Sequence, residues 1–482
     1  MAITILGLGP GDATQLTREA WSVLQASSEI YLRTRRHPTV QGLPAHLILH
    51  SFDQFYQQAG DLPQVYQNIA EEVVRLGQRP EGVVYAVPGH PWVGESTVAR
   101  IFERAEQVGL SVQVVDGIDF IAPTLARLGV DALDGLQVAD AAEMAVQHHP
   151  PLNPDVPAIV GQLYSRDVAS GVKLTLMNQY PDDHPVMLAH AVGTPQERLE
   201  QLPLYELDQR DDIDHLMALY VPPLPRPSAL ETFQDTIARL RAPDGCPWDR
   251  EQTHLSLRRN LLEEAYEVVA ALDAEDAGAL REELGDLLLQ IVLHAQIAVE
   301  SGEFSMADVV AEIDAKIKRR HPHVFGDTQV AGVGDVIANW ETIKKSERAQ
   351  GGNCDKSALD GVPAGLPALA QAEAYAERAS RVGFDWPDVE GVLDKVAEEV
   401  REIRQAAEAD RADEFGDLLF ALVNVARWMR IDPEAALRSA NARFVRRFRS
   451  VEAQARAQSR DLQGMSLADL DELWESAKRA NG

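Results

Sequence analysis

A proline-rich segment, 221–228, separates two parts of this chain whose hydrophobic patterns differ, and this contrast most constrains the fold. Four of its eight residues are proline, which removes backbone amide donors and favours an extended chain. Before it, short β-branched runs alternate with helical patterns. After it, strand patterns vanish and Ala-, Leu- and Glu-rich sequence with helical periodicity follows. The sequence therefore predicts an α/β region over 1–220, a linker over 221–228 and an all-α region over 229–482.

The length and net charge of the chain limit the number of domains and the kinds of ligand that we expect. A chain of 482 residues is too long for one hydrophobic core, so we expect several domains. The formal net charge of −30 argues against a nucleic-acid partner but allows a phosphorylated ligand bound through a metal. No apolar run is long enough to span a bilayer, the N-terminus lacks a basic signal-peptide region, and Cys246 and Cys354 match no zinc spacing. We expect a cytoplasmic protein with no membrane partner.

Three β-branched runs in the α/β region are each followed by a glycine-containing turn. The runs are 2–8, 83–87 and 111–115, and a helical pattern over Thr17–Ala26 follows the first turn. Strands that alternate with helices form a mostly parallel sheet, whose ligands bind at the carboxyl ends of the strands. Shorter runs then predict a second α/β lobe, with strands at 158–161, 172–176, 186–190 and 203–207.

Two acidic pairs at helical spacing lie near the start of the all-α region. Glu264 and Glu267 are three residues apart, as are Glu283 and Asp286, so each pair lies on one face of a helix. The segment 272–278 between them has the composition of a short helix–helix connection. If the two helices pack antiparallel, the four carboxylates converge, and their mutual repulsion favours a hard divalent cation. One such pair alone is more often a solvated acidic face.

The acidic pattern occurs twice, which a solvated face does not explain. The first four acids align with Glu399, Glu402, Glu414 and Asp417. Further aligned blocks are Ala315–Arg320 with Ala442–Arg447, Trp340–Lys344 with Trp474–Lys478, and Trp248 with Trp386 as the tryptophan before each acidic helix. Several blocks aligned in one order indicate an internal duplication. Only eleven residues separate Glu402 from Glu414, so the helices or their connection must be short in the second copy.

Each repeated block has a chemical role if the ligand is a nucleoside triphosphate. Carboxylates hold Mg²⁺, which neutralises phosphate oxygens and lowers the pKa of an attacking water, and a spare carboxylate accepts the water's proton. Arginines suit bidentate contacts with phosphate, a lysine adds another phosphate contact, and a tryptophan can stack on a base. Taken singly, the basic helices could be solvated faces and the tryptophans core anchors. Their repetition beside the acids favours the metal–phosphate interpretation.

The all-α region resembles the MazG nucleoside triphosphate pyrophosphohydrolases over essentially all of residues 229–482. The resemblance rests on Gly245–Asp249, Glu282–Asp286, Arg319–Asp327, Gly383–Trp386 and Phe415–Arg427. It implies two repeats, 229–355 and 356–482, and a homodimer formed through the helical region. It also implies Mg²⁺-dependent cleavage between the α- and β-phosphates, with Mn²⁺ as an alternative metal.

The resemblance also assigns roles to individual residues. In this family the C-terminal repeat can carry the catalysis, so Glu399, Glu402, Glu414 and Asp417 are expected to bind metal and act in catalysis. A second metal site is expected at Glu264, Glu267, Glu283 and Asp286, and whether it turns over is left open. Nucleotide-binding residues are expected to be Lys395, Asn424, Arg443, Arg447, Trp474 and Lys478, together with Trp248, Arg319, Arg320 and Lys344 of the first repeat. Asn424 has no polar counterpart in the first repeat, where Leu293 aligns.

Residues 1 to about 220 resemble the tetrapyrrole methylases, a two-lobed fold that binds S-adenosylmethionine. Gly7–Asp12 matches the opening motif of that family, and Tyr85–Pro91 resembles its second motif, with Gly-His-Pro for the usual Gly-Asp-Pro. Asp116–Phe120 stands where the family often has Pro-Gly-Ile-Ser-Ser. The resemblance implies cofactor binding at Gly7, Gly9, Pro10, Gly11, Asp12, Pro88, Gly89 and His90, and methyl transfer stays open because no catalytic base is evident. A methylase-like region followed by MazG repeats resembles the YabN type of bacterial protein.

Three functional hypotheses follow from these patterns. The first is a nucleoside triphosphate pyrophosphohydrolase that removes unwanted or excess nucleotides. The second is a methyltransferase whose all-α region serves for dimerisation or nucleotide sensing, and the third is a pair of regulatory binding modules. Pyrophosphate release from a panel of nucleotides with Mg²⁺ separates them. The sequence identifies neither the preferred nucleotide nor the methyl acceptor.

Overall fold

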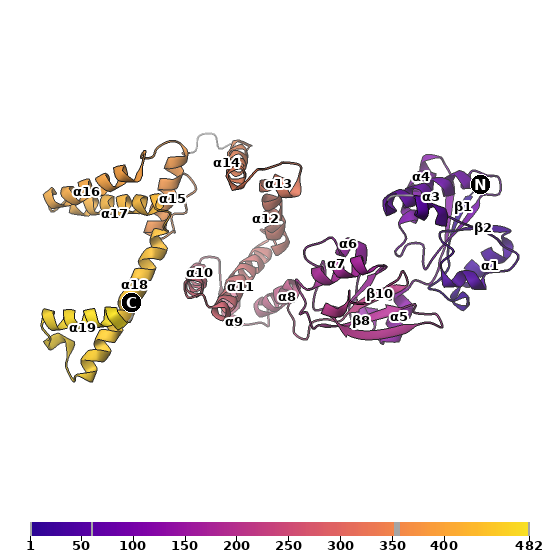
Figure 1. Ribbon diagram of the computed structural model, residues 1–482, viewed down its shortest axis with the longest axis horizontal. Helices are drawn as coiled ribbons and strands as arrows, with labels where there is room; N and C mark the ends of the chain where they lie inside the picture. Colours follow the sequence, from indigo (N-terminus) through magenta and orange to yellow (C-terminus); the bar gives the residue numbers. More distant parts are fainter. Residues whose placement is uncertain (1, 59–60, 351–356, 481–482) are drawn as a thin grey trace. The chain divides into compact units, whose positions relative to one another are not determined.

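The computed structural model describes residues 2–58, 61–350 and 357–480. By compactness the chain divides into two units, 1–312 and 313–482. The α/β region and the first helices of the all-α region lie in the first unit (Figure 1). The boundaries expected at 220, 228 and 355 stay predictions. Cys246 is a free thiol, whereas Cys354 lies outside the described residues.

The first lobe contains a five-stranded, fully parallel sheet with strand order β3-β2-β4-β1-β5. Its strands are β1 (Ala2–Gly7), β2 (Glu29–Leu32), β3 (Ile48–Ser51), β4 (Val83–Val87) and β5 (Ser111–Val115). The parallel sheet predicted from three β-branched runs is therefore confirmed. The central strand β1 pairs with both β4 and β5, so its side chains are buried on both faces, and Ile3, Ile5 and Leu6 are fully inaccessible to solvent.

Helices α1 (Arg18–Ala26), α2 (Asp53–Gln58), α3 (Leu62–Gly77) and α4 (Ser96–Gln107) pack on this sheet, and α5 (Ile121–Leu128) follows β5. Three of these helices, α1, α3 and α4, begin at side-chain caps. The hydroxyl of Thr17 accepts a hydrogen bond from the Ala20 amide at the start of α1, and the Glu95 carboxylate accepts one from the Thr97 amide at the start of α4. Each cap satisfies an amide that the helix itself cannot pair.

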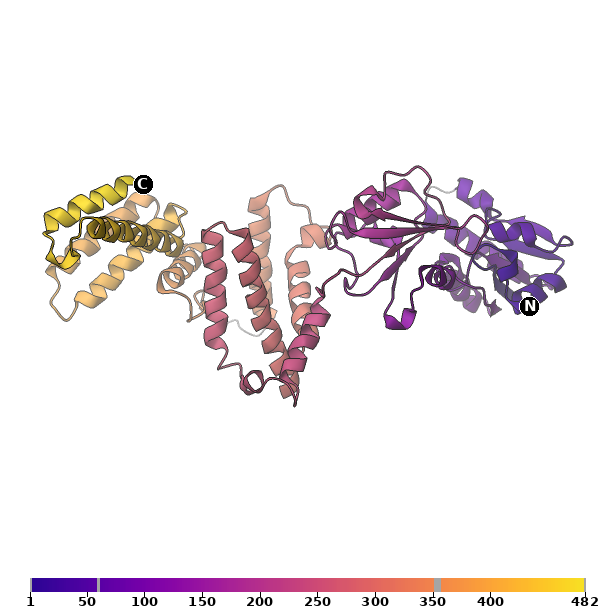
Figure 2. The same ribbon diagram turned by 90° about the horizontal axis from the view of Figure 1, so that it is seen from below.

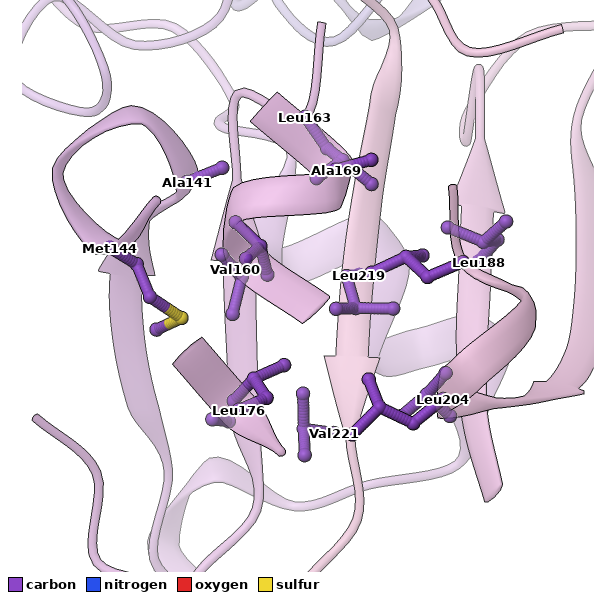
Figure 3. Close-up of a cluster of buried hydrophobic side chains, with 14 of the residues drawn as sticks. Ala141, Met144, Val160, Leu163, Ala169, Leu176, Leu188, Leu204, Leu219 and Val221 are labelled. Atoms are coloured by element: carbon purple, nitrogen blue, oxygen red, sulfur yellow. The ribbon is translucent and has the colours of Figure 1, made fainter. Parts of the chain in front are cut away.

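The second lobe has a mixed sheet with strand order β6-β7-β10-β8-β9, in which only β6 and β7 are parallel. Its strands are β6 (Gln137–Asp140), β7 (Ala158–Gly161), β8 (Pro185–His190), β9 (Arg198–Pro203) and β10 (Met217–Val221), and its helices are α6 (Ala141–Met144) and α7 (Arg166–Leu176). The expected second lobe is confirmed, as are the strands at 158–161 and 186–190. Figure 3 shows its core, where apolar side chains of α6 and α7 pack on the sheet.

Two of the four strand predictions for this lobe, at 172–176 and 203–207, are wrong. Residues 172–176 form the last turns of α7, which begins at the cap Ser165 and buries Ala169, Val172 and Leu176 on one face. That spacing is helical, so tertiary packing overrides the strand preference of the β-branched residues. Residues 203–207 begin at the last residue of β9 and continue into a 3₁₀ turn, Leu204–Glu206.

The proline-rich segment is docked on the second lobe and does not act as a free spacer. The Pro222 carbonyl lies 2.9 Å from His184 Nε2, and the Leu224 amide donates to the Pro154 carbonyl. The Asp155 carboxylate accepts hydrogen bonds from the amides of Ser228 and Ala229, at 2.7 and 3.1 Å, and from the Thr232 hydroxyl at 2.5 Å. Asp155 therefore caps the first helix of the all-α region from the neighbouring domain.

The rest of the described chain contains helices and no strand, as the sequence predicted. In the first copy they are α8 (Leu230–Arg241), α9 (Pro247–Glu251), α10 (Arg258–Asp273), α11 (Ala277–Ser301), α12 (Met306–Arg320), α13 (Pro322–Phe325) and α14 (Val333–Gln350). In the second they are α15 (Ala368–Arg381), α16 (Val389–Gln405), α17 (Arg411–Trp428), α18 (Pro433–Ala457) and α19 (Leu467–Ala480). The pair α10–α11 lies side by side in both views, as does α16–α17 (Figures 1 and 2). Short connections join each pair, which makes both pairs antiparallel.

One helix departs from the expectation that no segment is long and apolar enough to span a membrane. An 18-residue window of α11 has a mean hydropathy of 1.2. This test uses length and composition alone, and the core helix of a soluble protein passes it too. Residues Val292, Leu293 and Ile297 of α11 are buried in a core shared with α8. The absence of a membrane partner stays a prediction.

Candidate metal and nucleotide sites

Three of the four acids expected in the second repeat converge between α16 and α17. Carboxylate oxygens of Glu399, Glu414 and Asp417 all lie within 4.8 Å of one another. The antiparallel hairpin places Glu399 of α16 opposite the first two turns of α17, and the five-residue connection 406–410 is short enough to permit this. Glu402 is outside this group of three, but it is close enough to influence Glu414 electrostatically.

The electrostatics of this cluster show three carboxylates that repel one another. Partial burial, followed by the negative charges of Glu402, Glu399 and Asp417, raises the pKa of Glu414 above its ordinary value. Glu399 is only 3% exposed, and its Oε2 is buried with no hydrogen-bond partner. A buried carboxylate oxygen without a donor is costly, so this oxygen is available as a ligand for a cation in the cluster.

Lys395 holds the second oxygen of that buried carboxylate. Its ammonium lies 2.8 Å from Glu399 Oε1 and 2.9 Å from Glu398 Oε1. The hydrogen bonds to Glu399 and then Glu398 raise the pKa of Lys395. The structure therefore places Lys395, expected to bind nucleotide, one contact away from the acidic cluster, where it fixes the orientation of Glu399.

The first repeat contains an equivalent cluster between α10 and α11. Carboxylate oxygens of Glu264, Glu267 and Glu283 lie within 4.8 Å of one another. Burial, a hydrogen bond with Glu267 and the charge of Asp286 raise the pKa of Glu264, and burial with the charges of Glu267 and Asp286 raises that of Glu283. Asp286 therefore resembles Glu402 of the second repeat: it lies outside the group of three, but its charge raises the pKa of acids within the group. Both donor sets consist only of carboxylate oxygens, which fit a hard cation such as Mg²⁺.

The basic and aromatic residues of the second repeat gather at a different place, between α18 and α19. Trp474 packs on Phe444 with ring centroids 5.3 Å apart and lies beside the core of Val451, Ala455 and Leu473. Arg443 donates to Ser439, Arg447 has a buried Nε without a partner, and Lys478 pairs with Glu475 at 2.5 Å. Among the described residues, no hydrogen bond, ion pair or ring contact joins this group to the acids. Within the described residues of one chain, the acids and this basic and aromatic group therefore form two separate clusters, and the assignment of both to one nucleotide site stays a prediction.

Asn424 lies inside the helical bundle of the second repeat. It is 1% exposed, its Nδ2 donates to the Phe420 carbonyl, and its Oδ1 accepts from Arg427 Nε at 3.3 Å. Arg427 in turn pairs with Asp385 at 2.5 Å. Asn424 therefore orients an arginine that ties α17 to the loop before α16. Leu293, its aligned residue in the first repeat, is a buried apolar side chain.

The nucleotide-binding residues expected in the first repeat also lie in separate places. Arg319 and Arg320, at the end of α12, both bind the carboxylate of Glu347 on α14. Trp248 is 58% exposed on α9. Lys344 falls within α14, but its side chain lies outside the described residues.

The two glycine-rich turns of the first lobe meet at the carboxyl ends of β1 and β4. The amide of Gly9 donates to the Gly89 carbonyl at 3.2 Å, and the amide of Gly89 donates to the Gly9 carbonyl at 2.8 Å. Gly7 packs against Gly117 so closely that a Cβ on either would collide with the other's backbone. The glycines thus permit backbone-to-backbone packing of three turns.

Three of the eight expected cofactor residues line a cleft of about 670 Å³ between the lobes: Pro10, Pro88 and Gly89. A Cβ added to Gly89 would meet no atom within 4 Å, so this backbone faces open space. Asp12 instead caps a 3₁₀ turn by accepting from Thr14, and His90 lies 3.4 Å from Asp116. His90 and Asp116 are both departures from the family motifs, and the structure pairs them.

The sequence did not point to the polar residues that also line this cleft. Arg33 donates to Glu95 at 2.6 Å and to Tyr56 at 2.9 Å. Burial lowers the pKa of Arg33, but Glu95 and the nearby tyrosines, Tyr56 first, together outweigh burial and raise that pKa. Burial, and then the charge of His215, lowers the pKa of His37 to about 4. Nothing local in the sequence marks Arg33, His37 or the capping role of Glu95, and Glu95 lies far from Arg33 along the chain.

Comparison with known proteins supports the family resemblance expected for each half of the chain. Residues 2–208 match the family model for tetrapyrrole (corrin/porphyrin) methylases, and residues 252–325 match that for the MazG nucleotide pyrophosphohydrolase domain. The nucleoside triphosphate pyrophosphohydrolase/pyrophosphatase MazG of Thermotoga maritima is 44% identical over 52% of this chain and 95% of its own length. The nucleoside triphosphate pyrophosphohydrolase of Escherichia coli K12 is 47% identical over 50% and 94%.

One relative covers both halves. The uncharacterized protein YabN of Bacillus subtilis is 42% identical over 99% of this chain and 98% of its own length. The chain therefore belongs to the MazG family, in the YabN type of arrangement in which a tetrapyrrole methylase domain precedes the MazG region.

Proposed function

We propose that this protein is a Mg²⁺-dependent nucleoside triphosphate pyrophosphohydrolase that converts NTP and water to NMP and diphosphate and thereby clears unwanted nucleotides. The observation that carries the proposal is the buried, unpartnered Oε2 of Glu399 inside a cluster with Glu414 and Asp417. The names of the MazG relatives support the same reaction. Mn²⁺ has the same preference for oxygen ligands and is an alternative metal.

The chain's own residues divide the work of the reaction. Glu399, Glu402, Glu414 and Asp417 would hold the metal, with Lys395 fixing Glu399. When bound, the metal supplies charge neutralisation on the phosphates and a water of lowered pKa. A carboxylate not used as a ligand accepts the proton of the attacking water. Arg443, Arg447 and Lys478 supply positive charge for the phosphates, and Trp474 offers a ring for the base.

A homodimer through the helical region would bring these separate groups together. The acids lie on α16–α17 and the cations on α18–α19, without contact between the two groups among the described side chains. Large apolar side chains on α17 are exposed, among them Phe415 at 55%, Leu419 at 40% and Leu422 at 45%. An exposed apolar helix face favours self-association. In such a dimer one copy would offer metal ligands and the other the phosphate-binding arginines.

A panel of nucleotides with Mg²⁺ tests the reaction, with pyrophosphate and orthophosphate measured separately. We expect the unmodified chain to release pyrophosphate. The double variant Glu399→Gln, Glu402→Gln should lose this activity, and the double variant Glu264→Gln, Glu267→Gln should largely keep it. No product from any nucleotide would refute the proposal, and orthophosphate alone would mean that a different bond is cleaved. If activity survives the C-terminal change undiminished, the main site is the first repeat.

A second candidate function is S-adenosylmethionine-dependent methyl transfer, with the helical region serving for dimerisation or nucleotide sensing. The interlobe cleft favours it, because Gly89 presents open backbone there beside Pro10 and Pro88. Isothermal titration with S-adenosylmethionine tests cofactor binding. Binding without pyrophosphate release would favour this function over the first.

A further inference from the structure

The end of α12 carries two arginines that share one carboxylate. Glu347 Oε1 lies 2.8 Å from Arg319 Nε and 2.7 Å from Arg319 Nη2, and Glu347 Oε2 lies 2.8 Å from Arg320 Nη2. The Glu347 side chain is 21% exposed and that of Arg320 is 23% exposed. The hydrogen bond from Arg320, and then that from Arg319, outweigh burial and lower the pKa of Glu347 to about 2. This carboxylate is therefore charged at neutral pH.

In the second repeat, no carboxylate among the described residues is hydrogen-bonded to the aligned arginine, Arg447. The alignment of Ala315–Arg320 with Ala442–Arg447 places Arg320 on Arg447, and the alignment of Trp340 with Trp474 places Glu347 on Asn481. Asn481 lies outside the described residues, but its amide carries no charge. Arg447 Nε is buried and has no hydrogen-bond partner. Among the described residues, the two copies thus differ in whether a carboxylate hydrogen-bonds the basic end of the helix; Arg447 interacts with Glu475 through charge alone.

The arrangement of donors in the first repeat fits a phosphate group. Two guanidinium groups direct their N–H bonds at two oxygens of one anion, which is the bidentate pattern by which arginine binds carboxylate and phosphate alike. Resting on the pyrophosphohydrolase function proposed above, we infer that Glu347 occupies the phosphate position of the first repeat and keeps that repeat from binding a triphosphate. The basic end of α12 is then blocked in the first repeat, whereas Arg447 of the second repeat keeps a buried Nε without a hydrogen-bond partner.

The contact between Glu347 and the two arginines is reversible, because it consists of hydrogen bonds and ion pairs between side chains of two helices and involves no covalent bond. A polyphosphate brings more negative charge than the single charge of Glu347, so it can displace the carboxylate at high concentration. Glu347 is tethered on α14 and competes without loss of translational freedom. The expected behaviour is weak binding by the first repeat, which strengthens when Glu347 loses its charge.

The test uses the full chain with Glu399→Gln and Glu402→Gln, so that only the first repeat keeps all four of its acids. In this background we compare Glu347→Gln with Glu312→Gln, a matched loss of charge at an exposed residue of α12. The probe is inorganic triphosphate with Mg²⁺, measured by isothermal titration, followed by pyrophosphate release from the nucleotide panel. We expect Glu347→Gln to tighten triphosphate binding at least about tenfold, because the triphosphate then no longer has to displace the charge-assisted hydrogen bonds between Glu347 and the arginines. Adding Arg320→Ala to Glu347→Gln should remove the gain.

Two outcomes overturn the inference: Glu347→Gln binds triphosphate no more tightly than Glu312→Gln, or the gain persists with Arg320→Ala. Circular dichroism of each variant confirms that the helices are retained. The binding readout is independent of turnover, so it separates this inference from the proposed function. If the unmodified chain releases no pyrophosphate while Glu347→Gln still tightens triphosphate binding, the hydrolase proposal fails and the phosphate site stands.

Discussion

Replacing Glu399 by Gln should weaken metal binding at the second repeat by roughly a hundredfold. Three ligand atoms within 4.8 Å of one another place a central ion no more than about 2.8 Å from each, close to the Mg–O distance of about 2.0–2.1 Å. One negative charge at about 2.8 Å from a dication contributes about 3 kcal/mol even with the dielectric constant of water. That energy corresponds to roughly a hundredfold in the dissociation constant.

The control is the neighbouring residue. Glu398 also pairs with Lys395, at 2.9 Å, but its side chain is 49% exposed and it is not part of the cluster. Glu398→Gln therefore removes the same charge one residue away and should change metal affinity only a few-fold. Titration of Mg²⁺ by calorimetry, or of Mn²⁺ by electron paramagnetic resonance, measures both variants in a Glu264→Gln, Glu267→Gln background. Equal dissociation constants for the two variants would refute the assignment of Glu399 as a ligand.

Three further predictions concern the acids, the cleft and the docked linker. The pKa of Glu414 is raised in the fold, so its protonated form is favoured there and metal-free stability is lost as pH rises through that pKa. Glu414→Gln should raise the melting temperature with EDTA at pH 8, an advantage that shrinks toward about pH 5; a constant difference would contradict this. Gly89→Ala and Gly109→Ala each strain a left-handed residue, at φ +67° and +68°, by roughly 1–2 kcal/mol, but only the first should weaken S-adenosylmethionine binding in calorimetry. Asp155→Ala removes the cap of α8 at about 1 kcal/mol, which faster hydrogen exchange at Ser228–Thr232 should report, with Asp182→Ala as a surface control.

The contrast between the repeats follows from differences outside the acids. Both hairpins bring three carboxylates within the same distance, so the acids alone do not distinguish the two copies. The distinction lies in Glu347, which satisfies two arginines of the first repeat, and in Asn424, which orients Arg427 in the second. These residues make the second repeat the better candidate for turnover.

The sequence alone was sufficient for the features that depend on local spacing. The three-residue interval of Glu399 and Glu402, and of Glu414 and Asp417, places each pair on one helix face whatever surrounds it. The alternation of strands and glycine turns likewise predicted the parallel sheet. The strand predicted at 172–176 from its β-branched residues was wrong. These residues form part of a helix, because the buried residues of α7 recur at helical spacing.

Tertiary structure decided which distant residues meet. It paired Arg33 with Glu95 and His90 with Asp116, and it placed Glu347 on two arginines. It also separated Trp474 and its neighbouring cations from the acids that the sequence had grouped with them. Hydrogen-bond and charge partners across the chain depend on how helices pack, and residue spacing within one helix carries no information about that packing.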